Sequence, residues 1–168
     1  MIPRPSAASA ILAALLAAAS SPAALADGAA STQAAAPHAR LQAAKPTVRW
    51  DAASQVTADV TCDGKPDQLF VGYGKGGGKT VWLGVVPAGA RRPILMAFPV
   101  GGQAQNAFCA TPVRIETSPL VCADPENGER PGCKPAPGCM AFAMVDEACD
   151  SLRFYWNRDR GRLSWWRR

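Results

Sequence analysis

Histidine is almost absent from this chain, since His38 is the only one among 168 residues. It lies outside the segment that we expect to fold, so that segment has no imidazole base for a Ser–His or Cys–His nucleophilic pair. The six cysteines include no C-x-x-C pair, which removes the spacing of a zinc ribbon or a dithiol redox centre. We therefore expect a protein without catalytic activity.

Long apolar runs are also missing, apart from one near the start. Residues 10–19 are only Ala, Ile and Leu, Arg4 is the one charge before them, and Ala-Leu-Ala at 24–26 suits a cleavage site. This order is typical of a secretory signal peptide over residues 1–26. The alternative, a membrane anchor, is disfavoured because Pro22 interrupts a stretch that needs about 20 apolar residues. We expect a periplasmic or secreted protein that does not span a membrane.

All the cysteines follow the predicted cleavage site, as expected for disulfides formed in an oxidising compartment. They are Cys62, Cys109, Cys122, Cys133, Cys139 and Cys149. Six cysteines can pair in many ways, and the sequence does not choose among them. Two pairs are favoured: Cys133–Cys139, because the loop between them is short, and Cys62–Cys149, because both follow similar short turns.

Residues 27–46, which include His38, are rich in Ala, Ser, Gln and Pro and hold almost nothing large to bury. Such a composition does not offset the entropy lost on ordering, so we expect a disordered linker. An Ala-rich helix is the alternative, but it would have no apolar stripe with which to dock.

From residue 47 onward, short runs rich in β-branched and aromatic residues alternate with turns that contain Gly or Pro, which is the pattern of strands. The expected strands are Gln55–Thr61, Gln68–Tyr73, Thr80–Val86, Ile94–Val100, Val113–Glu116, Met140–Val145, Leu152–Trp156 and Arg162–Trp166. We predict that residues 47–168 form one compact all-β or β-dominated domain. A sandwich, a small barrel and a curled sheet all remain open.

Three connecting segments complete this picture. Residues 118–139 hold five prolines and three cysteines, which predicts an irregular loop pinned by disulfides, and Gln103–Ala110 is a candidate short helix. Gly78-Lys79-Thr80 ends like a phosphate-binding loop, but that motif needs Gly where Tyr73 stands, and a helix after it. A hairpin between the strands at 68–73 and 80–86 is the better interpretation.

The segment from Asp59 to Asp67 is the best candidate for a metal site. Side-chain oxygens occupy its first, third, fifth and ninth positions, Gly64 is at the sixth, and a carbonyl is available at the seventh. Ca²⁺ takes six to eight oxygen ligands, and alternate residues of a tight loop can supply them. The alternative is an Asp-Gly turn whose carboxylates accept backbone N–H hydrogen bonds.

This segment resembles the D-x-[DN]-x-D-G-x-x-D loops of FG-GAP and VCBS-type β repeats, which join two strands. The resemblance implies that the Ca²⁺ ligands are Asp59, Thr61, Asp63, Lys65 (through its carbonyl) and Asp67. Three further stretches, 62–67, 149–157 and the tryptophan-rich end, resemble small exported bacterial proteins of uncharacterised function. That second resemblance implies a compact single domain and no particular activity.

The last sixteen residues carry six arginines and one aspartate, interleaved with aromatic residues. Such a stretch can bind an anionic polymer through paired charge and stacking. The alternative is two ordinary strands with solvated arginines, in which adjacent Trp165 and Trp166 face opposite sides. The candidate contact residues are Arg153, Arg158, Arg160, Arg162, Trp165, Trp166, Arg167 and Arg168.

The sequence thus predicts an exported, non-catalytic β domain, with a candidate Ca²⁺ site that would stabilise it, that acts as an accessory or interaction module of the cell envelope. The second candidate function is binding of an anionic glycan, lipopolysaccharide or membrane surface, rather than nucleic acid, through the C-terminal arginines and tryptophans. Another envelope protein is a further possible partner. A third candidate, a hydrolase, would use the carboxylates of Asp63, Asp146, Glu147 and Asp150.

Overall fold

The computed structural model describes residues 36–76, 78–102, 104–124 and 128–167. The predicted signal peptide and residues 27–35 of the predicted linker lie outside these ranges. Within them, no helix has both the length and the apolar character needed to cross a bilayer.

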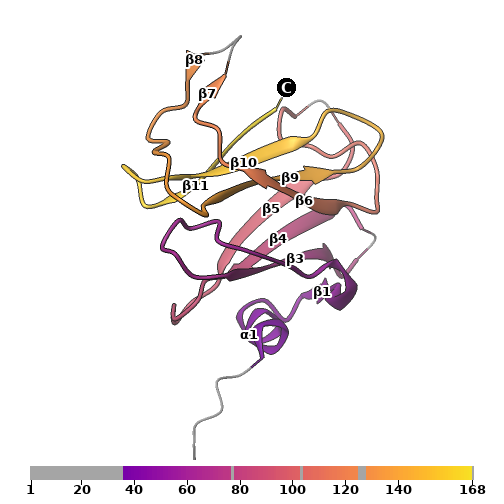
Figure 1. The fold of residues 1–168 in the computed structure, drawn as a ribbon. Coiled ribbons are helices and arrows are strands. Elements are labelled where there is room, and N and C mark those ends of the chain that lie inside the picture. Colours follow the sequence, from indigo (N-terminus) through magenta and orange to yellow (C-terminus); the bar gives the residue numbers. More distant parts are fainter. Residues whose placement is uncertain (1–35, 77, 103, 125–127, 168) are drawn as a thin grey trace, which may run out of the picture. The chain divides into compact units, whose positions relative to one another are not determined.

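Two antiparallel sheets face each other as a sandwich that is not closed into a barrel, which confirms the predicted β-dominated fold (Figure 1). The first sheet contains β1 (Val48–Trp50), β2 (Val56–Ala58), β3 (Asp67–Gly74), β4 (Thr80–Val86) and β5 (Ile94–Pro99). The second contains β6 (Arg114–Pro119), β9 (Met140–Val145), β10 (Leu152–Asn157) and β11 (Arg162–Arg167). Their orders are β1-β3-β4-β5, with β2 also paired to β3, and β11-β10-β9-β6. The strands at the two ends of each order are edge strands, so β5 and β11 each have one edge that no described strand pairs with along most of its length.

The core lies between the sheets and follows the alternation of the strands. Leu69 and Val71 of β3 are fully buried with Leu83 of β4. Phe142 and Phe154 from the second sheet stack at 4.7 Å between ring centroids and belong to the same cluster. The β3–β4 hairpin that was preferred over a phosphate-binding loop is also present.

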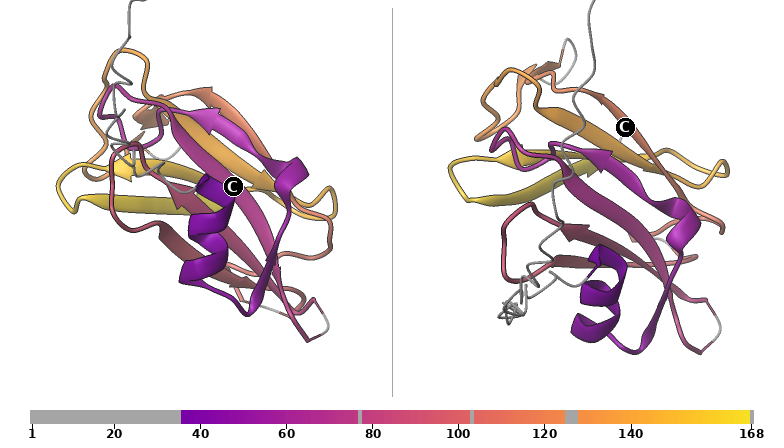
Figure 2. Two further views of the ribbon diagram at one scale, coloured as in Figure 1. Left: turned by 90° about the horizontal axis from the view of Figure 1, so that it is seen from below. Right: turned by 60° about the horizontal axis from the view of Figure 1, so that its bottom comes forward.

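Residues 37–44 form a docked helix, so the predicted disordered linker is wrong for this part. Helix α1 (Pro37–Ala44) lies on the outer face of the first sheet (Figures 1 and 2). Its Leu41 is fully buried in a second cluster with Trp50. A Cβ at Gly84 would lie 2.7 Å from Leu41 and 2.8 Å from Trp50, so the missing side chain makes room for both. One apolar residue suffices for docking because the sheet supplies the rest of the apolar surface.

Two further predictions, both for connecting segments, are corrected. Residues 104–110 form turns rather than a helix, and Phe108, which is buried, makes a β-bridge with Val100. The segment 118–139 is not wholly irregular, because it contains the hairpin of β7 (Ala123–Asp124) and β8 (Gly128–Glu129). A single 3-10 turn at Ala52–Ser54 completes the regular elements in the described ranges.

Three disulfides join Cys62 to Cys139, Cys109 to Cys149 and Cys122 to Cys133, so both favoured pairs are wrong. The N–H of Met140 donates to the carbonyl of Asp59 (2.8 Å), which places the residue before β9 beside the loop that holds Cys62. The pairing of Cys62 with Cys139 therefore depends on a contact between residues that are far apart in the sequence. The disulfides indicate an oxidising environment, as predicted.

Candidate functional site

The carboxylates of Asp59 and Asp63 hold the turn between β2 and β3. The carboxylate of Asp59 accepts hydrogen bonds from the N–H groups of Asp63 (3.2 Å) and Gly64 (2.9 Å). Asp63 Oδ1 accepts from the N–H of Lys65 at 2.9 Å. Gly64 has a φ of +81°, a conformation that glycine adopts without strain. These contacts are those of an Asp-Gly turn.

Asp67, the last candidate metal ligand, is fully buried. Its Oδ2 accepts from the N–H groups of Val60 (3.0 Å) and Thr61 (2.9 Å) and from the Thr61 hydroxyl (3.0 Å). Its Oδ1 accepts from the N–H of Ala88 at 3.1 Å. Asp67 therefore ties the loop before β3 to the end of β4. The calcium site stays a prediction, and the contacts present are those of its alternative.

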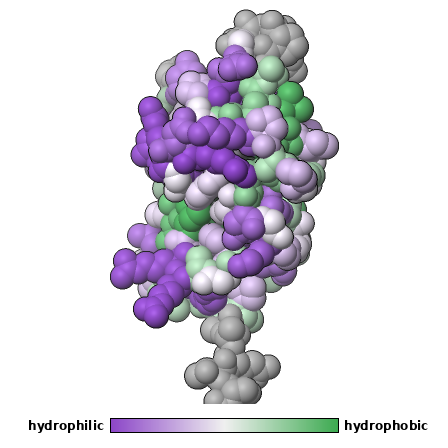
Figure 3. All heavy atoms as spheres, turned by 60° about the vertical axis from the view of Figure 1, so that its left-hand side comes forward, coloured by the Kyte–Doolittle hydropathy of each residue, from purple (hydrophilic) through white to green (hydrophobic). Residues whose placement is uncertain are grey.

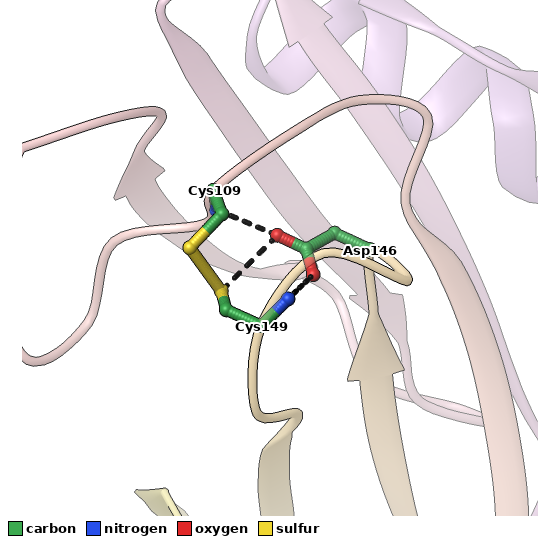
Figure 4. Close-up of side chains that lie close together, drawn as sticks. All are labelled: Cys109, Asp146 and Cys149. Carbon is green, nitrogen blue, oxygen red and sulfur yellow. Dashed lines mark hydrogen bonds between the residues drawn. A yellow bond between two sulfur atoms is a disulfide. The ribbon is translucent and has the colours of Figure 1, made fainter.

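In the described part of the chain, one group of His, Cys, Asp or Glu side chains brings three ligand atoms within 4.8 Å of one another: Cys109, Asp146 and Cys149 (Figure 4). Both sulfurs belong to one disulfide. The N–H groups of Cys109 (2.6 Å) and Ala110 (3.1 Å) donate to Asp146 Oδ2, and those of Ala148 and Cys149 donate to Oδ1 (both 3.1 Å). The group is thus a disulfide-bonded turn organised by one carboxylate.

Asp146 is only 5% exposed. Burial alone would raise its pKa, but the four backbone N–H hydrogen bonds outweigh burial and hold the pKa below its ordinary value. A carboxylate kept ionised in this way is a poor general acid. Of the other acids considered for a hydrolase, Glu147 forms an ion pair with Arg114, and Asp150 is exposed. These contacts do not favour the hydrolase.

The C-terminal strands place the two adjacent tryptophans on opposite faces, as predicted. Trp165 lies opposite Phe154 of β10 and shares its inward face, whereas Trp166 lies opposite Arg153 on the outer face. Trp166 is covered by the guanidinium of Arg130, 3.9 Å from the ring centroid. Trp165 remains 36% exposed although it points inward, because β11 is an edge strand.

A cleft opens beside Trp165, between β5 and β11. It encloses about 510 Å³, and we call it the edge cleft. Its lining residues are Ile94, Met96, Arg160, Arg162, Leu163, Ser164 and Trp165. The cleft thus combines an apolar wall and an exposed indole with two arginines, Arg160 and Arg162, that form part of its lining.

The arginines at this cleft carry uncompensated charge. Arg160 and Arg162 are exposed, and neither side chain forms an ion pair with another described residue. Asp159, the one acid in this stretch, pairs with Lys134 at 2.6 Å. The cleft therefore carries a positive potential that its own hairpin does not neutralise.

The remaining predicted contact residues are placed elsewhere. Arg158 donates to the carbonyl of Cys62, and Arg167 donates to the carbonyl of Ala107 and to the sulfur of Cys149. Arg153 is half-buried on the outer face, and Arg168 lies outside the described residues. The edge cleft gathers three of the predicted residues, Arg160, Arg162 and Trp165.

Sequence reasoning missed the other wall of the edge cleft, Ile94 and Met96. The sequence predicted a strand for both residues, but no local sequence pattern indicates that this strand lies at the edge of a sheet, next to the C-terminal strand. The one available signal is Arg91-Arg92, which Pro93 separates from Ile94, because this basic pair is like the arginines of the C-terminal hairpin.

Comparisons with known protein families, with curated proteins and with solved structures find no match to this chain.

Proposed function

We propose that this protein is an exported, non-catalytic interaction domain, periplasmic or secreted, which binds an anionic polysaccharide of the cell surface in the edge cleft. The observation that carries the proposal is that Arg160 and Arg162, which form no ion pair with the rest of the described chain, lie beside the exposed indole of Trp165. The signal peptide predicted for residues 1–26 and the three disulfides support export.

The chemistry of the cleft suits an acidic sugar chain. Guanidinium groups donate paired hydrogen bonds to carboxylate, sulfate or phosphate groups. An exposed indole offers a flat apolar face on which the C–H face of a sugar ring can pack. Ile94 and Met96 extend that apolar surface on the opposite wall. A small inorganic anion would use only the arginines.

Heparin is a practical polyanion with which to test the proposal. We expect Arg160→Ser/Arg162→Ser to weaken binding about tenfold or more and to reduce the slope of log affinity against log salt by about two. Trp165→Ala should weaken binding by a similar factor while leaving that slope unchanged, because it removes stacking rather than charge.

A matched control removes the same charge from the opposite edges of both sheets. Arg49 lies on β1 and Arg114 on β6, so Arg49→Ser/Arg114→Ser keeps net charge equal to that of the cleft variant. If the control weakens heparin binding as much as the cleft variant does, net charge alone explains the binding and the proposed site is wrong. Lipopolysaccharide and anionic vesicles, run in parallel, separate a glycan from a lipid surface.

A further inference from the structure

A second basic cleft lies between α1 and the loop that joins β4 to β5. It encloses about 550 Å³, and we call it the helix cleft. Its lining residues are Arg40, Ala43, Ala44, Arg91, Arg92, Pro93 and Leu95. Arg40 is held in place because it donates to the carbonyl of Ala90. Arg91 and Arg92 are exposed, and neither forms an ion pair within the described ranges.

The two clefts lie on opposite faces of the first half of β5. Ile94 and Met96 lie opposite Val85 and Leu83, point into the sandwich and line the edge cleft. Leu95, between them, points to the outer face and lines the helix cleft. Neighbouring residues of one strand therefore form a wall of each cleft. No strand of the described chain pairs with this half of β5 on its open edge.

The charge on both sides of this edge has the same sign. Arg160 and Arg162 stand at one cleft, and Arg91 and Arg92 stand at the other. On the face drawn in Figure 3, an apolar area lies between groups of hydrophilic side chains. Like charges on either side of one strand repel, and a chain of negative groups laid across the strand would relieve that repulsion at both clefts together.

We infer that the ligand is a linear polyanion that crosses the open edge of β5 and occupies the edge cleft and the helix cleft at once. The inference rests on the proposed function and adds that ligand length decides affinity. A short acidic sugar reaches one cleft only. A longer chain binds the second cleft as an intramolecular step and gains from its high effective concentration.

Heparin oligosaccharides of defined length, titrated by calorimetry, test this inference. We expect affinity to rise about 100-fold or more over a narrow range of length, where the chain first reaches both clefts. Arg91→Ser/Arg92→Ser should abolish that rise and leave unchanged the part of disaccharide binding that Arg160→Ser/Arg162→Ser removes, which is the binding in the edge cleft. Arg40 is left intact in this variant, because its hydrogen bond to Ala90 holds the loop. Arg49→Ser/Arg114→Ser again serves as the charge-matched control and should preserve the rise.

The outcomes separate the two proposals. A gradual increase with length that is equal in the wild type and in Arg91→Ser/Arg92→Ser would overturn the two-cleft inference and leave the edge cleft standing. If Arg160→Ser/Arg162→Ser binds both short and long ligands as tightly as the wild type does, the proposed function itself is overturned. Poly-glutamate that binds as tightly as heparin of equal charge would show that a sugar chain is the wrong ligand class.

Discussion

Asp67 supplies the sharpest test of how this fold is held together. The change is Asp67→Ala, which removes the acceptor of three backbone N–H groups and one hydroxyl. A buried donor left unpaired costs about 1–3 kcal/mol, and the Thr61 hydroxyl can rotate to another partner. Counting the buried N–H groups of Val60 and Thr61 fully and the half-buried one of Ala88 in part, we expect a loss of about 3–6 kcal/mol. That is a large share of the 5–15 kcal/mol typical of a domain.

The assay is urea unfolding of the oxidised protein, followed by tryptophan fluorescence. Asp63→Ala is the matched control, since Asp63 is exposed and accepts a single N–H hydrogen bond. We expect this control to cost less than about 1 kcal/mol. If Asp67→Ala does not fold, Asp67→Asn keeps the volume and turns an amide NH₂ toward N–H donors, which should still cost about 2 kcal/mol. A loss below about 1 kcal/mol at Asp67, or equal losses at both positions, would refute the capping argument.

The same two variants decide the calcium prediction. A loop that binds Ca²⁺ at 100 times its Kd would gain about 2.7 kcal/mol over the protein in EDTA. Both Asp63→Ala and Asp67→Ala would then abolish this gain. If the carboxylates only cap the turn, stability is the same in Ca²⁺ and in EDTA for the wild type and for Asp63→Ala.

Three further predictions concern other parts of the fold. Because the pKa of Asp146 lies below its unfolded value of about 3.9, the contribution of its carboxylate to stability is complete above that pH and is lost as the pH falls through the lower folded-state pKa. The wild type should thus lose more stability than Asp146→Asn between about pH 5 and pH 2 in urea titrations. Parallel curves for the two proteins would contradict this. Leu41→Ala should lower the free energy of unfolding by about 2–3 kcal/mol, because Leu41 is fully buried over Gly84. Gln42→Ala is the control, and an equal loss in both variants would show that α1 is not docked. Replacing both cysteines of one disulfide by serine should lower the free energy of unfolding by an amount that grows with the length of the closed loop. We expect losses of about 4.5 kcal/mol for Cys62–Cys139, about 4 kcal/mol for Cys109–Cys149 and about 3 kcal/mol for Cys122–Cys133, whose loops span 77, 40 and 11 residues. Urea midpoints in another order would argue against loop entropy as the cause.

The strands were predictable because their evidence is local. Alternating residues such as Leu69, Val71 and Val81 state both the strand and its buried face, and β3, β4 and β10 lie within one residue of their predicted bounds. Helix α1 was missed because its evidence is not local: Leu41 docks only since Gly84, far along the chain, leaves space for it. Composition alone cannot show such a fit.

The candidate site divides in the same way. Charge and aromaticity near the C-terminus were visible, and so was the opposite orientation of Trp165 and Trp166. Which arginines lack a partner among the described residues depends on the fold. Arg167 donates a hydrogen bond to the carbonyl of Ala107, and Asp159 pairs with Lys134 rather than with a neighbouring arginine. The disulfide pairing depends likewise on contacts such as that of Met140 with Asp59.

The unpaired edges of β5 and β11 also bear on self-association. An open edge presents free backbone groups to which a strand of another copy can add, and charged side chains beside it prevent this. Arg160, Arg162, Arg91 and Arg92 surround these edges, so the charges that would attract a polyanion also keep copies of the chain apart. Neutralising them therefore removes a barrier to sheet extension between molecules. Near charge equivalence with a bound polyanion, the protein should be most prone to form intermolecular β-structure, and excess polyanion should reverse this by restoring repulsion.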